Sequence, residues 1–365
     1  MFPQSELVIE TGKLVHNWHF FKRFQPNSQI VPVLKSDAYG HGLVRAALAL
    51  EKAGANPLAV FNLGEAELLR QAGVSASIWI LEGILPCDLP AAAHLQITAA
   101  CWSFEQAQAL AACAKSEKCR CKIHLKIDTG MSRLGFLPGQ IPEILNLLQA
   151  VPQLELTGCF SHLAVSAEAQ HPLTLQQLQN FRQALSLLPD SCSERHLCAT
   201  NGILNQLAPD LPFARLGIGL YGYSDEQEFD AHLMPAMTFR SRVLSVKELP
   251  EGSLVSYSGL YKLPETGRLA VIPVGYADGY PRMLSNKAEV LIRGKRVPVR
   301  GRICMGMLIA DAGSIPDVQP GEEVVLLGKQ GNECITAAEL AKMAGTIAHE
   351  ILCNLGKHPN RKICE

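Results

Sequence analysis

The sequence lacks the features that direct a chain to nucleic acid, into membranes or into the secretory pathway. Its 33 Lys and Arg balance 34 Asp and Glu, and no basic block is present, so a nucleic-acid or anionic-membrane partner is not expected. The N-terminal stretch MFPQSELVIETGKLV has no basic region followed by an apolar core, which argues against a secretory signal. The longest stretch without Asp, Glu, Lys or Arg, residues 89–104, contains Pro90 and His94 and is a poor membrane span. We therefore expect a cytoplasmic protein.

Metal-ligand spacing is also missing. Of the 12 cysteines, only Cys119 and Cys121 lie close together, with no second pair and no histidines at zinc-site spacing. Free thiols in a reducing compartment, and no bound metal, are the expectation. With 48% apolar and 18% charged residues, the 365-residue chain can bury a sizeable core, and its length is typical of about two domains.

The first 230 residues contain a regular alternation of apolar runs and helix-like segments rich in Ala, Leu, Glu and Gln. Continuous apolar runs are typical of strands buried on both faces. The runs are residues 29–35, 58–62, 77–81, 95–101, 122–128, 156–163, 195–200 and 213–222. Eight strand–helix alternations over this length predict a (β/α)8 barrel, a TIM-like α/β fold. A doubly wound open sheet is the competing interpretation.

The pattern changes after about residue 232. Short strand-like runs are joined by tight turns, and residues 293–295 (RGK) are typical of a hairpin tip. A helical pattern returns only at residues 336–356. We predict a barrel domain over residues 1–231 and a mostly antiparallel β domain over residues 232–365.

Few polar residues stand at the carboxyl ends of the predicted barrel strands, where barrel active sites lie. They are Lys35, Tyr39, Lys126, Asp128, Arg133, His162, Asn201 and Arg215. Each alone fits a structural barrel with surface charges. Together, lysines, arginines and a histidine at one barrel mouth predict a cationic cup suited to a small dianion plus a carboxylate.

The lysine at position 35 ends an apolar run, PVLKSDAYGHG, where a buried strand would not tolerate an unused amine. A lysine that is desolvated or close to other cations loses part of its charge and becomes a nucleophile toward carbonyls. Pyridoxal phosphate is the carbonyl cofactor that most often uses such a lysine. Gly217 and Gly219 would let backbone N–H groups approach its phosphate.

Seven segments carry a resemblance to a known family, in matching order and spacing over nearly the whole chain. They read VPVLKSDAYGHG, KIDTGMSRLGF, ARLGIGLYG, LVSYS, IPVGYADGYPR, VPVRGRICM and GTIAHE. In these segments the chain resembles the alanine racemases, pyridoxal-phosphate enzymes with an N-terminal barrel and a C-terminal β domain. The resemblance implies racemisation of L-alanine to D-alanine, which would supply bacterial cell-wall synthesis.

The resemblance also implies roles for the barrel residues. Lys35 would hold the cofactor as an internal aldimine, and Tyr39 would bind its phosphate together with the backbone of Gly217 and Ile218. Arg215 would face the pyridine nitrogen. Arginine keeps its proton, so that nitrogen would remain an unprotonated acceptor, and the ring would be a weaker electron sink.

Further roles implied by the resemblance concern the substrate and a second subunit. Lys35 would serve as the base on one face of the substrate, and Tyr257 of a partner chain on the other. Arg133 would bind the substrate carboxylate, supported by the backbone of Met305 from the partner, so a homodimer with shared sites is implied. Lys126 matches a lysine that is often carbamylated in the family, and His162 would join the hydrogen bonds behind Arg215.

Three positions depart from the family pattern. His349 stands where a tyrosine is usual, Gly306 where an aspartate usually follows the methionine, and Gly202 follows Asn201 where a serine usually binds phosphate. Asn201, Gly202 and His349 remain candidate cofactor ligands. Fewer phosphate contacts and a wider site predict, as an alternative, a racemase that also accepts serine.

Two other functions compete with racemisation. Small single-barrel proteins bind pyridoxal phosphate without turnover, but they lack a β domain and so any equivalent of Tyr257 and Met305. Decarboxylases of the same layout usually place an acid at the pyridine nitrogen, where this chain has Arg215.

Overall fold

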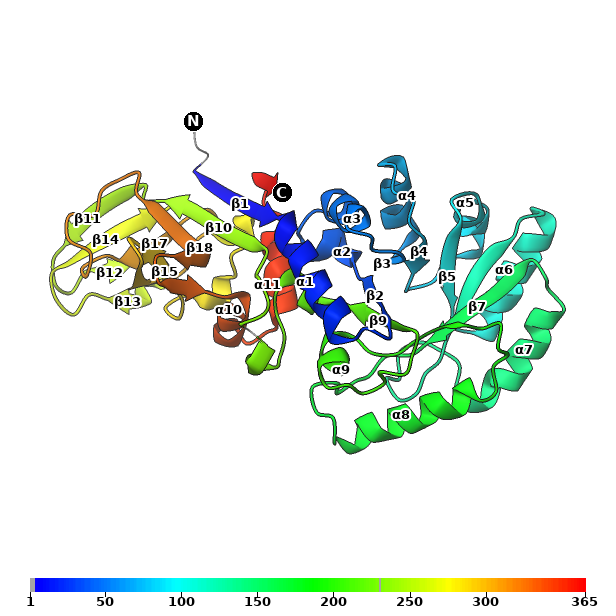
Figure 1. Cartoon of the computed structure of the whole chain (residues 1–365). Helices are drawn as coiled ribbons and strands as arrows, with labels where there is room; N and C mark the ends of the chain where they lie inside the picture. Colours follow the sequence, from blue (N-terminus) through cyan, green and yellow to red (C-terminus); the bar gives the residue numbers. More distant parts are fainter. Residues whose placement is uncertain (1–3, 230) are drawn as a thin grey trace. The chain divides into compact units, whose positions relative to one another are not determined.

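The computed structural model describes residues 4–229 and 231–365. Its residues fall into two compact units, which are described separately (Figure 1). The barrel unit comprises residues 14–38 and 43–234, and the β unit comprises residues 1–13, 39–42 and 235–365, in each case as far as described. No helix in the described ranges is long and apolar enough to cross a membrane.

The barrel unit is built on eight parallel strands in the order β2-β9-β8-β7-β6-β5-β4-β3, and a bridge between Val33 and Ala59 links the two end strands. Each of the eight predicted apolar runs overlaps one of these strands, so the predicted barrel is confirmed. The strands are β2 (Gln29–Pro32), β3 (Leu58–Val60), β4 (Ile78–Ile80), β5 (Ile97–Cys101), β6 (Cys121–Lys126), β7 (Leu154–Phe160), β8 (Glu194–His196) and β9 (Phe213–Leu216).

Helices follow most of these strands, and local sequence signals fix where they begin. Asn62 caps α4 by accepting a hydrogen bond from the Glu65 amide, and Ser103 caps α6 by accepting one from Gln106. The helices are α1 (Thr11–Phe24), which begins in the β unit, α3 (Leu43–Lys52), α4 (Leu63–Gln71), α5 (Leu89–His94), α6 (Phe104–Ser116), α7 (Ile141–Gln149), α8 (Pro172–Leu185) and α9 (Thr200–Leu204).

The β unit is mostly antiparallel, as predicted. Its largest sheet has the order β16-β15-β18-β10-β1-β20, with β19 on β18, beside a sheet β11-β14-β17 and a pair β12-β13. The strands are β10 (Met237–Arg242), β11 (Ser245–Leu249), β12 (Leu254–Val255), β13 (Tyr261–Lys262), β14 (Gly267–Ile272), β15 (Glu289–Ile292), β16 (Lys295–Pro298), β17 (Leu308–Asp311), β18 (Glu323–Gln330), β19 (Glu333–Ile335) and β20 (Arg361–Cys364).

The first strand differs from the predicted division of the chain. The sequence placed residues 1–231 in the barrel, but β1 (Ser5–Glu10) pairs antiparallel with β10 and parallel with β20 in the β unit. Its alternating burial, with Leu7 and Ile9 inside, is the pattern of a strand with one buried face. The partners lie more than 200 residues away, so no local signal in the sequence identifies them.

Local glycines shape two further features of the β unit. The predicted hairpin tip is confirmed, because β15 and β16 are joined by Arg293 and Gly294, both with positive φ, as a two-residue hairpin turn requires. The predicted helical stretch 336–356 is two helices, α10 (Ala337–Ala344) and α11 (Ala348–Leu355). Gly345 ends the first in a left-handed conformation, with φ of 74°.

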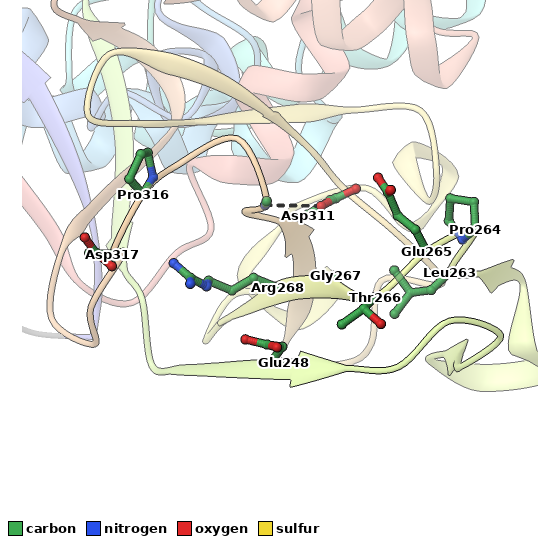
Figure 2. Close-up of a pocket in the computed structure, with 11 residues that line it drawn as sticks. Glu248, Leu263, Pro264, Glu265, Thr266, Gly267, Arg268, Asp311, Pro316 and Asp317 are labelled. Atoms are coloured by element: carbon green, nitrogen blue, oxygen red, sulfur yellow. Dashed lines mark hydrogen bonds between the residues drawn. The ribbon is translucent and has the colours of Figure 1, made fainter.

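A surface pocket of about 620 Å³ opens beside β11 and β14 in the β unit (Figure 2). Figure 2 shows Arg268 among the carboxylates of Glu248, Asp311 and Asp317, with Asp311 accepting a hydrogen bond from the Gly313 amide at 3.3 Å. None of the site residues predicted from the sequence lines this pocket, so it is separate from the predicted site.

Gly40 follows Tyr39 in the short segment that belongs to the β unit, and it is a point of close backbone approach. Its φ is 82°, and an added Cβ would lie 2.6 Å from the Leu352 carbonyl oxygen and 2.8 Å from the Gly356 Cα. Both contacts are with backbone atoms of the same unit, which cannot move aside as a flexible side chain would. The segment after Lys35 therefore requires glycine here.

We expect Gly40→Ala to lower the free energy of unfolding by about 2–4 kcal/mol, because left-handed strain and a backbone clash add together. Gly345→Ala is the matched control, since its φ is 74° but nothing lies within 4 Å of the added Cβ. It should cost only about 1 kcal/mol. Urea titrations followed by circular dichroism measure both, and equal losses would contradict the close approach at Gly40.

Candidate active site

The barrel unit brings together five of the predicted site residues: Lys35, Lys126, Arg133, His162 and Arg215. They come from the ends of different strands, yet each acts on the charge of its neighbours. Burial, then Arg133 and Arg215, lower the pKa of Lys126 to about 8, with a smaller contribution from Lys35. Burial and the same cations lower the pKa of His162 to about 3, which leaves this ring neutral. The predicted cationic cup is thus present at the carboxyl ends of the strands.

Aromatic rings lie against the cations of this cup. The Lys126 Nζ and the Arg215 Cζ each lie 5.5 Å from the centre of the Phe160 ring, and the Lys35 Nζ lies 5.5 Å from the centre of the Phe61 ring. Cation–π contact offsets part of the repulsion between like charges, by about 0.5–2 kcal/mol for each contact. It does not supply the counter-charge that a bound anion would.

The residues after Lys35 form a left-handed turn, labelled α2 (Lys35–Tyr39) in Figure 1. Ser36, Asp37 and Ala38 have φ of 53–55°, and Tyr39 has φ of 53°. Left-handed geometry costs about 1–2 kcal/mol for each residue other than glycine. Hydrogen bonds hold the turn, from the Ser36 amide to the Glu65 carboxylate at 2.6 Å and from the Leu43 amide to the Asp37 carboxylate at 2.7 Å. Backbone strain of this kind is concentrated at functional sites.

Arg215 is buried on β9, and its guanidinium is held on several sides. Its Nη2 donates to the carbonyl oxygens of Ser161 and Leu197, both at 2.8 Å, and lies 3.3 Å from the His162 Nδ1. Its Nη1 lies 2.5 Å from the Nδ1 of His196, a residue that the sequence analysis did not single out. These bonds fix the plane of the guanidinium.

In the loop after β8, the buried hydroxyl contact is made by Thr200 and not by the predicted Asn201. The Asn201 amide donates to the Asp225 carboxylate at 2.6 Å, and Gly202 packs against Cys198. Thr200 was missed: it is buried, and its hydroxyl accepts a hydrogen bond from the Gly219 amide at 3.0 Å. A hydroxyl residue at the junction of strand and helix, next to a glycine-rich turn, was the signal that could have identified it.

Gly217 and Ile218 lie in the turn after β9. Gly217 has φ of −92° and ψ of −108°, and the short 3-10 helix η3 (Ile218–Tyr221) begins directly after it. The turn therefore follows Arg215 by two residues and is held to Thr200 through Gly219. The predicted backbone contacts of Gly217 and Ile218 with a phosphate stay predictions.

The remaining predicted site residues lie in the β unit. The rings of Tyr39 and His349 are 5.5 Å apart between centroids, at 41°. The side chains of Tyr257 and Met305 are 68% and 63% exposed, which is unusual for large apolar groups. Ser256, next to Tyr257, donates to the Arg302 carbonyl oxygen at 2.7 Å, so the segments of Tyr257 and Met305 are tied together.

Tyr257 and Met305 belong to a set of exposed large side chains, which we call the exposed apolar face. Its members are Leu254, Tyr257, Leu260, Tyr276, Met283, Met305, Met307 and Ile347. Backbone and side-chain hydrogen bonds connect several of their segments, such as that from the Ala277 amide to the Met305 carbonyl oxygen and that from Asn286 to the Leu260 carbonyl oxygen. Several exposed apolar side chains on linked segments are typical of a protein–protein contact surface.

Comparison with known proteins agrees with this architecture. The family model "Alanine racemase, N-terminal domain" matches residues 9–225, and "Alanine racemase, C-terminal domain" matches residues 236–363. The alanine racemase of Syntrophobacter fumaroxidans is 40% identical over 363 residues, covering 97% of this chain and 96% of that protein. The alanine racemase of Synechocystis is 39% identical over 357 residues, covering 96% of each.

Solved structures give the same result. The alanine racemase of Streptomyces lavendulae aligns with a TM-score of 0.93 at 31% identity, covering 100% of this chain and 98% of that one. That of Clostridium difficile 630 aligns at 0.91 and 32%, covering 100% and 97%. The matching family models, relatives and structures identify the chain as an amino-acid racemase with a (β/α)8 barrel and a C-terminal β domain. Within that class, the chain belongs to the alanine racemase family.

We expect Lys126 to titrate near pH 8 and Arg133→Gln to raise its pKa, because removing a nearby positive charge favours the protonated amine. NMR of protein labelled with ¹³C at the lysine Cε, in buffer free of carbon dioxide, measures this midpoint. Arg182→Gln is the control, since Arg182 is 63% exposed and paired with Asp210. A midpoint near 10.5 in the unaltered protein, or no rise in Arg133→Gln, would contradict the arrangement of charges.

Proposed function

We propose that the protein interconverts L-alanine and D-alanine with pyridoxal phosphate held on Lys35. The observation that carries this proposal is the convergence of Lys35, Lys126, Arg133 and Arg215 at one end of the barrel, shown by the depressed pKa of Lys126. An anionic ligand would relieve the repulsion within such a cluster. The names of the relatives, all of them alanine racemases, supply the reaction.

The donor groups present fit pyridoxal phosphate. A dianionic phosphate suits the turn at Gly217 and Ile218 with the Thr200 hydroxyl beside it, and Tyr39 and His349 are further candidate donors. The Lys35 amine lies near Lys126 in this cluster of cations, and a lysine amine is the group that binds an aldehyde cofactor covalently. A neighbouring structure, the alanine racemase of Bartonella henselae with covalently bound pyridoxal phosphate, has a TM-score of 0.90 at 27% identity. When bound, this cofactor draws electrons from the substrate α-carbon and makes its proton acidic.

The protein's own residues then move that proton and hold the substrate. Lys35 is the base on one face of the α-carbon and Tyr257 the base on the other, so each removes a proton in one direction and returns it in the other. Arg133 binds the substrate carboxylate. Arg215, which donates to the carbonyl oxygens of Ser161 and Leu197, would face the pyridine nitrogen as a donor and leave it unprotonated.

We further propose a homodimer in which the exposed apolar face, with Tyr257 and Met305, completes the site of a second copy. The support is the 68% exposure of Tyr257, a side chain that would otherwise be expected to be partly buried. Two identical chains that exchange this face form two composite sites. Dilution to the monomer should then abolish activity, and activity that is independent of concentration would contradict this assembly.

Carbamylation of Lys126 is also proposed. With a pKa of about 8, roughly half of the amines are neutral at pH 8, and a neutral amine adds carbon dioxide to give a carbamate and a proton. The product is an anion that would pair with Arg133 rather than repel it. A carbamate ¹³C signal after addition of ¹³C-bicarbonate, absent in Lys126→Met, detects the modification.

A second candidate function is a racemase that accepts both alanine and serine. Nothing lies within 4 Å of a Cβ added at Gly306, and His349 is shorter than the tyrosine usual in the family. Both observations favour a wider substrate entry. Comparison of L-alanine and L-serine as substrates decides between the two functions, because activity on alanine alone removes the second.

We expect Tyr257→Phe to lower kcat for alanine racemisation by about 10²–10⁴-fold, the contribution of a placed acid–base group, while cofactor absorbance is unchanged. Tyr261→Phe is the control, because Tyr261 packs against Arg300 with its ring and keeps that contact as phenylalanine. Chiral chromatography of the product gives the rate from each enantiomer. Equal activity of the two variants would contradict the role of Tyr257.

A further inference from the structure

The hydrogen bonds of Arg215 continue through the barrel interior to a carboxylate that no predicted role uses. The Arg215 Nη1 lies 2.5 Å from the His196 Nδ1, and the His196 Nε2 lies 3.2 Å from the His124 Nδ1. The His124 Nε2 lies 2.7 Å from the Glu194 Oε2. We call this series, which connects β9, β8 and β6 within the barrel unit, the Arg215–Glu194 chain.

The chemistry of its ends fixes the direction of every bond in this chain. Arginine can only donate and an ionised carboxylate can only accept, whereas a neutral imidazole does one of each. His196 must therefore accept at Nδ1 and donate from Nε2, and His124 must do the same. Each ring then carries its proton on Nε2.

The protonation states agree with this order. Burial, then the charge of Arg215, lower the pKa of His196 well below its usual value, and burial also lowers that of His124 despite the opposing effect of Glu194. Burial raises the pKa of Glu194, but the hydrogen bond with His124, together with contributions from Thr157 and Lys122, lowers it, and the net shift is downward. Two neutral rings thus stand between a fixed cation and a carboxylate.

A glycine on β7 leaves room for the hydrogen bond between His124 and Glu194. β7 lies between β6 and β8, and its Gly158 stands where the His124–Glu194 bond crosses. A Cβ on Gly158 would lie 2.7 Å from the His124 Nε2 and 2.3 Å from the Glu194 carbonyl oxygen. The register of β6 against β7 also shifts directly before His124. Only glycine leaves room for the bond.

The His196 ring lies stacked against two aromatic rings. The His196 ring stacks on Phe160 at 4.9 Å and 4°, and on Trp79 at 4.7 Å and 18°. Phe160 also contacts Arg215. His196 therefore has little freedom to rotate, and the position of its proton decides which bonds it forms.

We propose that Glu194 is a positioning residue that acts on Arg215 through His124 and His196. Its carboxylate holds the His124 end of the chain in the same proton order that Arg215 imposes from the other end, so the rings present an acceptor, never a donor, to the Arg215 guanidinium. Arg215 is thereby held in the orientation that the proposed function requires toward the pyridine nitrogen, so the inference rests on that function.

The test uses the full-length protein without cofactor, labelled with ¹⁵N in histidine, and NMR that distinguishes the two tautomers. We expect His124 and His196 both to carry the proton on Nε2 at pH 7. In Glu194→Ala we expect a mixture of tautomers at His124, whose Nε2 loses its acceptor, and a smaller change at His196, whose Nδ1 still accepts from Arg215. In Glu194→Gln we expect the unaltered order, because the amide oxygen still accepts. Protons on Nδ1 in the unaltered protein, or no change in Glu194→Ala, would overturn the proposal.

Racemisation kinetics of the protein with pyridoxal phosphate bound provide the second measurement. We expect Glu194→Ala to lower kcat about tenfold, with KM for alanine within about twofold, since Arg215 acts on the cofactor and not on the substrate. Glu194→Gln should recover most of this loss. Glu155→Gln, an exposed acid on the neighbouring strand β7, is the matched control and should change neither the tautomers nor kcat. A loss of stability with unchanged kcat would assign Glu194 a structural role and overturn the proposal.

The two proposals fail in different ways. If pyridoxal phosphate does not bind, the proposed function fails, while the tautomer order in the cofactor-free protein still holds or fails by itself. If the cofactor binds to Lys35 but the tautomers are not ordered, only the role of Glu194 is lost. Should Glu194→Ala not fold, Glu194→Gln and the tautomers of the unaltered protein still decide the matter.

Discussion

The repulsion among four cations at one end of a barrel is the constraint on which the site depends. Burial, then the charges of Arg133 and Arg215 and, less strongly, of Lys35, lower the pKa of Lys126 to about 8 against the opposing effect of Asp128. Like charges in a partly desolvated mouth are unfavourable unless an anion joins them. The barrel supplies the rigidity that holds them there, since its eight strands are closed by hydrogen bonds and fixed by buried apolar side chains. The arrangement predisposes the mouth to a phosphate and a carboxylate.

The same constraint explains the less regular features around the mouth. Four consecutive residues after Lys35 adopt left-handed geometry, which is maintained by the carboxylates of Glu65 and Asp37 at exposed positions. The contacts of Arg215 include four neutral groups, two carbonyl oxygens and two imidazoles. Neutral acceptors bind a guanidinium without cancelling its charge, so the attraction for an anionic ligand is preserved. A carboxylate in direct contact with Arg215 would cancel that attraction.

The sequence predicted those parts of the structure that local pattern determines. Continuous apolar runs identified all eight barrel strands, and Lys35, Lys126 and Arg215 were found because they end or interrupt such runs. The sequence did not predict pairings between distant segments. β1 pairs with β10 and β20, and no local pattern near residue 5 indicates partners more than 200 residues away. Thr200 was passed over because Asn201 beside it is the more conspicuous polar residue. The role of Glu194 was hidden because it depends on the absence of a side chain at Gly158 on another strand.

Reduction with borohydride after incubation with pyridoxal phosphate, followed by peptide mass spectrometry, tests the central claim most directly. The account predicts one stable phosphopyridoxyl label, on Lys35, because its amine joins the cationic mouth at the first strand end. Lys126 also has an amine, but the residue is only 8% exposed, so it should remain unlabelled. A label on Lys126 or on a surface lysine, or no label in protein that turns over alanine, would contradict the account.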